Sequence, residues 1–354
     1  MRRDVYVTVT GFRSNPCWAN QWLAARASMP LDRGTTGGCK TMSTRKFLMA
    51  ALAMSVVTAP TLVHAEGEVK TIGLAVPNLS ADFFVQIATG VEKYAGEKGI
   101  EVIVMDAKND TNTQVSQVQD LMTQEIDAFI YIPAGAAAAA VPTRLARKAG
   151  IPVINVDRVP DNEPGDTFIA GESIESSYLV CSHLIEAAGG DGKMFIIHGQ
   201  KGTTPEVDRY EGCMRAVNEH DGVEVVAEQW TERWSQEEGF SISQNLLQAH
   251  PDVEIIFGQA DGIAMGAAQA VEVANLTEQV FVGGYDGDMT ALEHLSKCEP
   301  PFIVTATQRT REMGRLAVDS ALAVAAGEEV PAEQITVAAL TTCEEAPGYF
   351  ADHP

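Results

Sequence analysis

The sequence has few basic residues and lacks the usual metal-binding motifs. Its 354 residues include 25 lysines and arginines against 48 aspartates and glutamates, a net charge of −23. Nucleic acids and anionic lipid surfaces bind basic protein surfaces, so we expect neither as a partner. The seven histidines are scattered, and no cysteine–histidine group has the spacing of a zinc site. We therefore expect no bound metal.

The signatures of nucleotide-binding and hydrolytic enzymes are also missing. After the first predicted strand, residues 77–82 read PNLSAD and lack the glycines of a dinucleotide-binding G-x-G-x-x-G loop. The sequence contains no Walker loop and no G-x-S-x-G nucleophile elbow. We expect no cofactor and no enzymatic activity, and turnover of a bound compound would contradict this.

Long apolar runs are scarce, and the one near the N-terminus is typical of an export signal. Residues 42–46 form a short basic region, and the apolar run 47–57 is too short to span a membrane. Residues 63–65 fit the small-residue cleavage rule, which predicts a signal peptide over residues 42–65 with cleavage near Ala65. We interpret residues 1–41 as a mis-assigned N-terminal extension before a natural start at Met42. A cytoplasmic tail on an anchored protein is the alternative.

Cleavage would leave 17 basic and 46 acidic residues, a net charge of −29. Such an excess suggests solubility in high salt, where self-repulsion is screened, and a halophilic source is a hypothesis. Four cysteines would remain, an even number that permits disulfides in an exported protein. Cys298 and Cys343 flank the last two predicted strands and would meet if those strands pair antiparallel. Cys181 and Cys213 lie in helix-patterned segments, and we interpret them as buried thiols.

From Thr71 onward, short apolar runs alternate with amphipathic stretches, which is typical of βαβ units. The predicted strands cover residues 72–76, 101–105, 128–132, 152–156, 167–170, 193–198, 223–228, 254–257, 280–283, 302–307 and 334–340. They divide into two wound sheets with a boundary near residue 170. The helix 311–326 and the final strand are too little for a third domain and would return to the two lobes. Several crossings between lobes form a hinge that a ligand in the cleft could close.

The clearest chemistry is in residues 151–158, IPVINVDR, an apolar strand that ends in Asp157 and Arg158. Ligands of open α/β sheets bind beyond the carboxyl ends of the strands. A carboxylate accepts hydroxyl hydrogens and a guanidinium donates to oxygens, so the pair suits a neutral polyhydroxy compound. The alternative is a solvated ion pair of little energetic consequence.

With further motifs added, residues 70–342 resemble the periplasmic sugar-binding proteins of bacterial ABC transporters, in the ribose/galactose-binding branch of type I. The matching stretches are Phe83-Phe84, Val156-Asp157-Arg158, Gly202-Thr203-Thr204 leading to Arg209, QNLLQAHP at 244–251, FGQAD at 257–261, GGYDG at 283–287, and Gln308. The resemblance implies an α/β fold of two similar Rossmann-like lobes with parallel-rich sheets, joined by a three-strand hinge. It places residues 66–170 and 309–333 in the N-terminal lobe, and residues 171–308 and 334–354 in the C-terminal lobe.

The resemblance also implies a monosaccharide-sized ligand between the lobes. Aromatic rings contact the apolar faces of a sugar ring, and charged or amide groups bind its edge hydroxyls. The residues in these roles would be Phe83 and Phe84 with Trp234 opposite, then Asp157, Arg158, Arg209, Asp286, and Gln308 at the third crossover. The alternative is that the aromatic residues only pack in the core and that the polar residues are ordinary surface residues without a ligand.

Three departures from the family pattern concern the ligand. Ala81 and Ala260 replace polar side chains, and Pro77 replaces a small hydroxyl residue. An unpaired buried hydroxyl costs about 1–3 kcal/mol, so a standard ribose, glucose or galactose pocket is not expected. A polyol, a cyclitol or an unusual pentose is plausible. Replacement hydrogen-bonding groups could come from Asn78, Asp82, Glu206 and Asp208, and Gln259 and Asp261 of the matching FGQAD stretch are possible additional contacts.

By this resemblance the protein is a monomeric periplasmic solute-binding protein that delivers a sugar or polyol to an ABC transporter permease. It would contact the membrane only through the permease. An alternative is a binding protein that reports its ligand to a chemoreceptor or another signalling partner. A transcription regulator with the same lobes would carry an N-terminal helix-turn-helix, where this chain has its export signal.

Overall fold

The structure is a computed structural model that describes residues 69–160 and 162–351. The predicted extension, residues 1–41, and the predicted signal peptide, residues 42–65, lie outside the described residues. Within the described ranges, no helix combines the length and apolar character that crossing a membrane requires.

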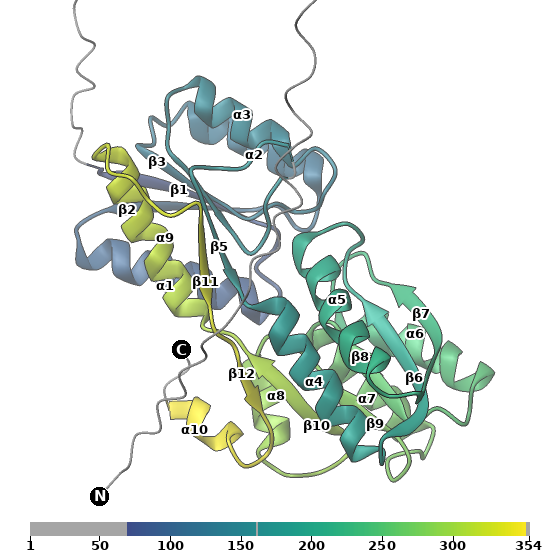
Figure 1. Ribbon diagram of the computed structural model, residues 1–354. Coiled ribbons are helices and arrows are strands. Elements are labelled where there is room, and N and C mark those ends of the chain that lie inside the picture. The colour runs from purple at the N-terminus through teal and green to yellow at the C-terminus, as the bar shows by residue number, and fades with distance from the viewer. Residues whose placement is uncertain (1–68, 161, 352–354) are drawn as a thin grey trace, which may run out of the picture. The chain divides into compact units, whose positions relative to one another are not determined.

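The first sheet contains six strands, all paired in parallel, in the order β11-β5-β4-β3-β1-β2. The strands are β1 (Thr71–Val76), β2 (Glu101–Asp106), β3 (Ala128–Tyr131), β4 (Val153–Val156), β5 (Thr167–Gly171) and β11 (Glu333–Thr336). Its helices are α1 (Asp82–Glu97), α2 (Thr111–Met122), α3 (Ala140–Lys148) and α9 (Thr310–Ala325). Helices α1 and α9 pack on one face of the sheet, and α2 and α3 pack on the other (Figure 1). This two-sided burial explains why the strands are nearly continuous apolar runs.

The second sheet repeats this plan in the order β12-β10-β9-β8-β6-β7. Its strands are β6 (Asp191–His198), β7 (Gly222–Trp230), β8 (Ile255–Gly258), β9 (Phe281–Gly283), β10 (Phe302–Thr307) and β12 (Ala339–Thr341), of which only the β10–β12 pair is antiparallel. Helices α4 (Ser173–Ala187) and α5 (Thr204–Asn218) cover one face, and α6 (Gln236–Ala249) and α7 (Asp261–Val273) cover the other. The short helices α8 (Met289–Leu295) and α10 (Ala346–Ala351) complete this lobe.

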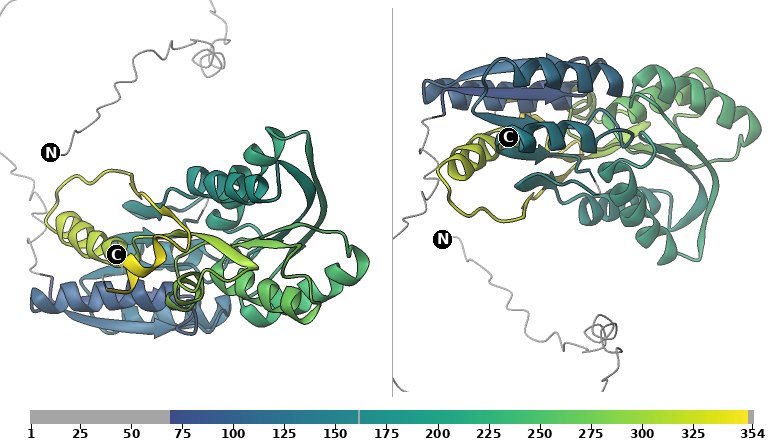
Figure 2. Two further views of the ribbon diagram at one scale, coloured as in Figure 1. Left: turned by 90° about the horizontal axis from the view of Figure 1, so that it is seen from below. Right: turned by 90° about the horizontal axis from the view of Figure 1, so that it is seen from above.

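Three connections pass between the two sheets, as the hinge prediction required. They are the segments between β5 and α4, between β10 and α9, and between β11 and β12 (Figure 2). Gln308 lies in the second connection along the chain, so its predicted place at the third crossover was wrong.

The final predicted strand, residues 334–340, is in fact two strands. Its first half belongs to β11 and pairs with β5, whereas Ala339–Thr341 is β12 and pairs with β10. The predicted lobe boundary after residue 333 therefore falls inside β11. An extended apolar segment shows the same alternating pattern in either sheet, so the sequence did not reveal where the chain changes sheets.

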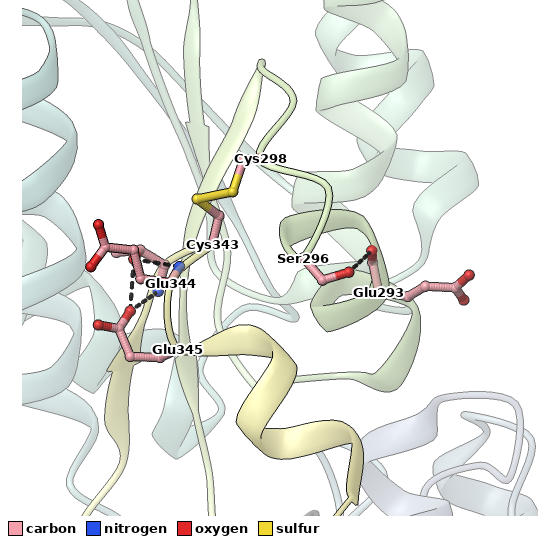
Figure 3. Close-up of a disulfide and its surroundings, with 7 residues drawn as sticks. Glu293, Ser296, Cys298, Cys343, Glu344 and Glu345 are labelled. Atoms are coloured by element: carbon pink, nitrogen blue, oxygen red, sulfur yellow. Dashed lines mark hydrogen bonds between the residues drawn. A yellow bond between two sulfur atoms is a disulfide. The ribbon is translucent and has the colours of Figure 1, made fainter.

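Both cysteine pairs form disulfides. Cys298 and Cys343 are joined as expected, with their Cα atoms 5.1 Å apart, because β10 and β12 pair antiparallel (Figure 3). Cys181 and Cys213 were predicted to be thiols, and this was wrong, because they link α4 to α5 with Cα atoms 5.2 Å apart. The helices approach closely at Gly212, where a Cβ atom would lie 2.1 Å from the carbonyl oxygen of Ile174.

Candidate functional site

A cavity of about 390 Å³ lies between the carboxyl ends of strands from the two sheets. This volume is within the ~300–1,000 Å³ range of small-molecule sites. Its lining residues come from segments 78–84 and 157–158 of the first lobe, and 205–209, 233–236, 260–262 and 286–290 of the second. In the part of the chain that the structure describes, no group of three or more metal-ligating side chains is placed to hold an ion.

Asp157 and Arg158 follow β4 directly and line this cavity. Only 6% and 4% of their surfaces are exposed, and Nε of Arg158 lies 3.3 Å from Oδ2 of Asp157. Nη1 of Arg158 also donates to the carbonyl oxygen of Pro133 at 3.0 Å. Burial raises the pKa of Asp157, while Arg158 and Arg209 oppose that shift. The pair is therefore a buried group at the cavity wall, and the alternative of a solvated ion pair is wrong.

A second ion pair lines the cavity from the other lobe. Nη2 of Arg209, on α5, lies 3.1 Å from Oδ1 of Asp286, which follows β9. Burial raises the pKa of Asp286 to about 7, although the Arg209 charge acts in the opposite direction. Gln308 does not line the cavity; its Nε2 donates to Oδ1 of Asp286 at 3.0 Å. Gln308 thus holds Asp286 from behind, and its direct contact with a ligand remains a prediction.

Three aromatic rings complete the wall that the sequence predicted. Phe83 and Phe84, at the start of α1, meet edge to face with ring centroids 5.2 Å apart. The guanidinium of Arg158 lies 5.4 Å from the ring centroid of Phe84 and 5.6 Å from that of Trp234. That of Arg209 lies 5.5 Å from the Trp234 ring. Aromatic faces and charged edges therefore surround one space.

The backbone is unusual at three of these positions. Asp157, Trp234 and Asp286 have φ values of +61°, +59° and +126°, which side-chain-bearing residues rarely adopt. Such conformations persist where the surrounding structure imposes them, and they concentrate at functional sites.

Of the six additional candidates, two line the cavity. Asn78 accepts hydrogen bonds at Oδ1 from the backbone N–H groups of Ser80 and Ala81, which fixes the turn into α1. Asp82 accepts from Nε2 of Gln86 and, across the lobes, from the backbone N–H of Met289, each at 3.0 Å. Both are therefore in place to contact a ligand.

The other four candidates do not line the cavity. Glu206 accepts from the indole N–H of Trp230 and from the backbone N–H of Gly202. Gln259 accepts from the N–H of Gly199, and its own carbonyl oxygen accepts from Arg209. These two residues support the loops that carry the site.

Asp261 and Asp208 have different surroundings. Asp261 is fully buried and accepts from the backbone N–H groups of Gly287 and Asp288 and from the hydroxyl of Thr305. Its burial raises its pKa to about 6. Asp208 is half-buried, and burial raises its pKa too. Asp261 thus organises the loop after β9, and it does so from behind the cavity wall.

Sequence reasoning missed several lining residues, namely Ser80, Pro205, Arg233, Ser235, Gln236, Asp288 and Thr290. Ser235 had a detectable signal, because it and Glu238 form the capping box that begins α6. Of the three residues that depart from the family pattern, Ala81 and Ala260 line the cavity, whereas Pro77 does not.

Comparison with known proteins agrees with this geometry. Residues 72–329 match the family described as periplasmic binding protein domain. The chain belongs to this family. This periplasmic binding protein is 30% identical over 286 residues to the ribose import binding protein RbsB of Escherichia coli K12, covering 81% of this chain and 94% of that one. The chain is also 29% identical to the ribose import binding protein RbsB of Bacillus subtilis, over 73% of this chain and 83% of that one.

Solved structures of solute-binding proteins have the same type I fold. The protein from Bacillus halodurans C-125 with bound myo-inositol gives a TM-score of 0.74 at 28% identity, covering 80% of this chain and 97% of that one. The protein from Actinobacillus succinogenes 130z with bound D-allose gives the same TM-score and identity, covering 79% and 100%. The predicted family and fold class of this periplasmic binding protein are thereby confirmed.

Proposed function

We propose that this periplasmic binding protein captures a monosaccharide-sized polyhydroxy ligand between its lobes and delivers it to an ABC permease. The observation that carries the proposal is the pair of buried ion pairs, Asp157–Arg158 and Arg209–Asp286, that face one cavity from opposite lobes. Carboxylates accept hydroxyl hydrogens, and guanidiniums donate to hydroxyl and ring oxygens. The two pairs supply both kinds of hydrogen bond around the edge of a hydroxylated ring.

The aromatic groups favour a ring with apolar faces. Phe83 and Phe84 belong to the first lobe and Trp234 to the second, so a flat ligand can contact aromatic carbon on two sides. Ala81 and Ala260 supply no hydrogen bonds from their side chains to a ligand. This favours a polyol, a cyclitol or an unusual pentose over ribose or glucose.

Closure of the lobes would couple binding to recognition by the permease. Backbone N–H of Met289 donates to Asp82, and backbone N–H of Val159 donates to the Thr204 hydroxyl at 3.3 Å, so two hydrogen bonds join the lobes next to residues that line the cavity. A ligand that contacts both lobes stabilises the closed state by its differential affinity. The permease would dock on the closed protein in the periplasm, after export and signal cleavage near Ala65.

The test is a thermal-shift screen of the exported protein, purified from the periplasm of cells that express the full-length gene. The panel contains pentoses, hexoses, linear polyols and inositols. A ligand at 100 times its dissociation constant adds about 2.7 kcal/mol of stability. A clear shift with at least one of these compounds is expected, and no shift with any of them would contradict the proposal.

A further inference from the structure

The charged groups that line the cavity are not balanced. Asp157 and Asp286 are each paired with an arginine, at 3.3 Å and 3.1 Å. The third lining arginine, Arg233, is more than half exposed and has its Nε 3.7 Å from a carboxylate oxygen of Glu238. Every arginine at the cavity therefore already has an acidic partner. Two further carboxylates, those of Asp82 and Asp288, also line the cavity.

Neither of these carboxylates has a cationic partner in the part of the chain that the structure describes. Asp82 accepts only from neutral groups, the side-chain amide of Gln86 and the backbone N–H of Met289. No lysine, arginine or histidine within residues 69–160 and 162–351 forms a salt bridge with either carboxylate. The cavity wall thus carries two carboxyl groups that have no ion-pair partner among the described residues.

The two carboxylates lie on opposite lobes but close to one another. Asp82 begins α1, and its Oδ2 is 3.0 Å from the backbone nitrogen of Met289, the residue after Asp288. Burial and the carboxylates of Asp286, Asp261 and Asp82 raise the pKa of Asp288 well above its usual range, while the Arg209 charge acts in the opposite direction. The closed lobes therefore bring two carboxyl groups together at the cavity, and their mutual repulsion favours a cation or a proton between them.

We propose that the ligand carries a protonated amine on its hydroxylated ring, bound between Asp82 and Asp288. This inference rests on the proposed function and narrows its ligand class to amino sugars and amino cyclitols. An ammonium is a compact charge with three donors, so it can bond both carboxylates and still contact a third acceptor. Asp82 directly follows Ala81, so the lining offers a carboxylate beside a position where the polar side chain expected from the family pattern is absent.

The ammonium offsets a specific electrostatic cost. Asp82 and Asp288 are half-buried, and closure around a neutral ligand would leave both carboxylates without a cationic partner, which is unfavourable. The competing solution is a proton on Asp288, which would then donate a hydrogen bond to a hydroxyl of a neutral ligand. If the ligand supplies an ammonium, the aminated compound should bind more tightly than its neutral partner. If Asp288 holds a proton, the neutral compound should bind at least as tightly.

The experiment compares matched ligands by isothermal titration calorimetry of the exported protein at pH 7. The pairs are D-glucosamine with D-glucose, D-galactosamine with D-galactose, and an inosamine with myo-inositol. For at least one pair, the aminated compound should bind at least about tenfold more tightly. In Asp288→Asn or Asp82→Asn, that preference should fall to about threefold or less. The matched control, Asp221→Asn, changes an exposed aspartate outside the cavity and should retain the full preference.

The outcomes separate this inference from the function on which it rests. If neutral compounds bind as tightly as or more tightly than their aminated partners, the sugar-binding function stands and the ammonium is rejected. If the aminated compound is preferred equally by Asp288→Asn, Asp82→Asn and the unchanged protein, the proposed location is wrong. If no compound of either kind binds, both proposals fail. Circular dichroism spectra and melting temperatures of the variants establish that each is folded.

Discussion

The indole of Trp234 occupies the space beside Gly199, where a side chain would otherwise be. A Cβ atom on residue 199 would lie 1.9 Å from Cη2 of Trp234, well inside any tolerated contact. Gly199 follows β6, and its N–H donates to Gln259, so the backbone at this point cannot easily move away. The absence of a side chain at Gly199 therefore lets the Trp234 indole line the cavity from the second lobe.

Substitution of Gly199 by alanine should displace Trp234 from the cavity wall. We expect ligand affinity to fall at least about tenfold, which corresponds to about 1.4 kcal/mol, because one face of the ligand loses its contact. Calorimetry measures the affinity, and tryptophan fluorescence reports the changed environment of the indole. Gly96→Ala is the control: it lies in α1 with open space around it and should be neutral or stabilising. Unchanged affinity in Gly199→Ala would show that Trp234 does not contact the ligand.

Removal of the carboxylate of Asp157 should weaken binding severely. Asp157→Ala leaves the Arg158 guanidinium without its partner in a buried site, and such truncations cost about 2–5 kcal/mol, a loss of at least about 30-fold. The control is Arg144→Ala, which breaks an exposed ion pair of 3.8 Å with Glu163 and should change stability by less than about 1 kcal/mol. Near-native affinity in Asp157→Ala would remove the first lobe's ion pair from the binding site.

The pH dependence of stability should reveal the buried carboxyl of Asp286. Its pKa is raised to about 7 in the folded protein, whereas an unfolded chain has an aspartate pKa of about 3.9. Between these values the folded state binds more protons than the unfolded state. This carboxyl's contribution is therefore fully present below about pH 4 and is lost as the pH rises toward 7.

The check is a series of melting temperatures from pH 4 to 8 for the unliganded protein and for Asp286→Asn. The difference between the two curves reports Asp286 together with Asp288, whose pKa the Asp286 charge raises. We expect the unchanged protein to lose stability relative to the variant as the pH rises. A difference that is constant with pH, or one that changes in the opposite direction, would contradict the assignment.

The disulfide between α4 and α5 should contribute substantially to stability. It closes a loop of 32 residues, for which the loss of chain entropy in the unfolded state predicts about 3–4 kcal/mol. The double variant Cys181→Ala, Cys213→Ala should lower the free energy of unfolding by about this amount and leave ligand affinity unchanged. A thiol count on the exported protein, unfolded without reductant, should find no free cysteine. Two free thiols that peptide mapping after alkylation assigns to Cys181 and Cys213 would mean that this pair is not oxidised.

The sequence predicted much of the fold because each strand is a short apolar run between turns, and the two-sided burial of parallel strands preserves that signal. Asp157 and Asp286 both line the cavity: Asp157 was expected there because it follows a buried strand, and Asp286 was expected there from the family resemblance. How closely two helices pack was harder to predict from the sequence. Helical periodicity shows that Cys181 and Cys213 are buried, but it does not show that Gly212 brings α4 and α5 close enough for a disulfide.

The missed and misplaced residues have a common cause. Asp288 and Arg233 lie in loops, where no periodic pattern indicates which way a side chain points. Gln259 and Asp261 are polar residues of a matching motif, yet they bond backbone groups behind the cavity wall. Sequence identifies such polar groups as significant, but only the fold distinguishes a ligand contact from a support for one.

The most direct test of the account is calorimetric titration of the strongest ligand from the screen into the unchanged protein, Arg158→Lys and Arg209→Lys. Lysine keeps the positive charge but loses the planar fork that donates to two oxygens. Because the arginines belong to different lobes, the account predicts one ligand per chain and a loss of affinity of at least about tenfold in each variant. Full affinity in either variant would mean that the ligand is held by one lobe, and capture by closure would be wrong.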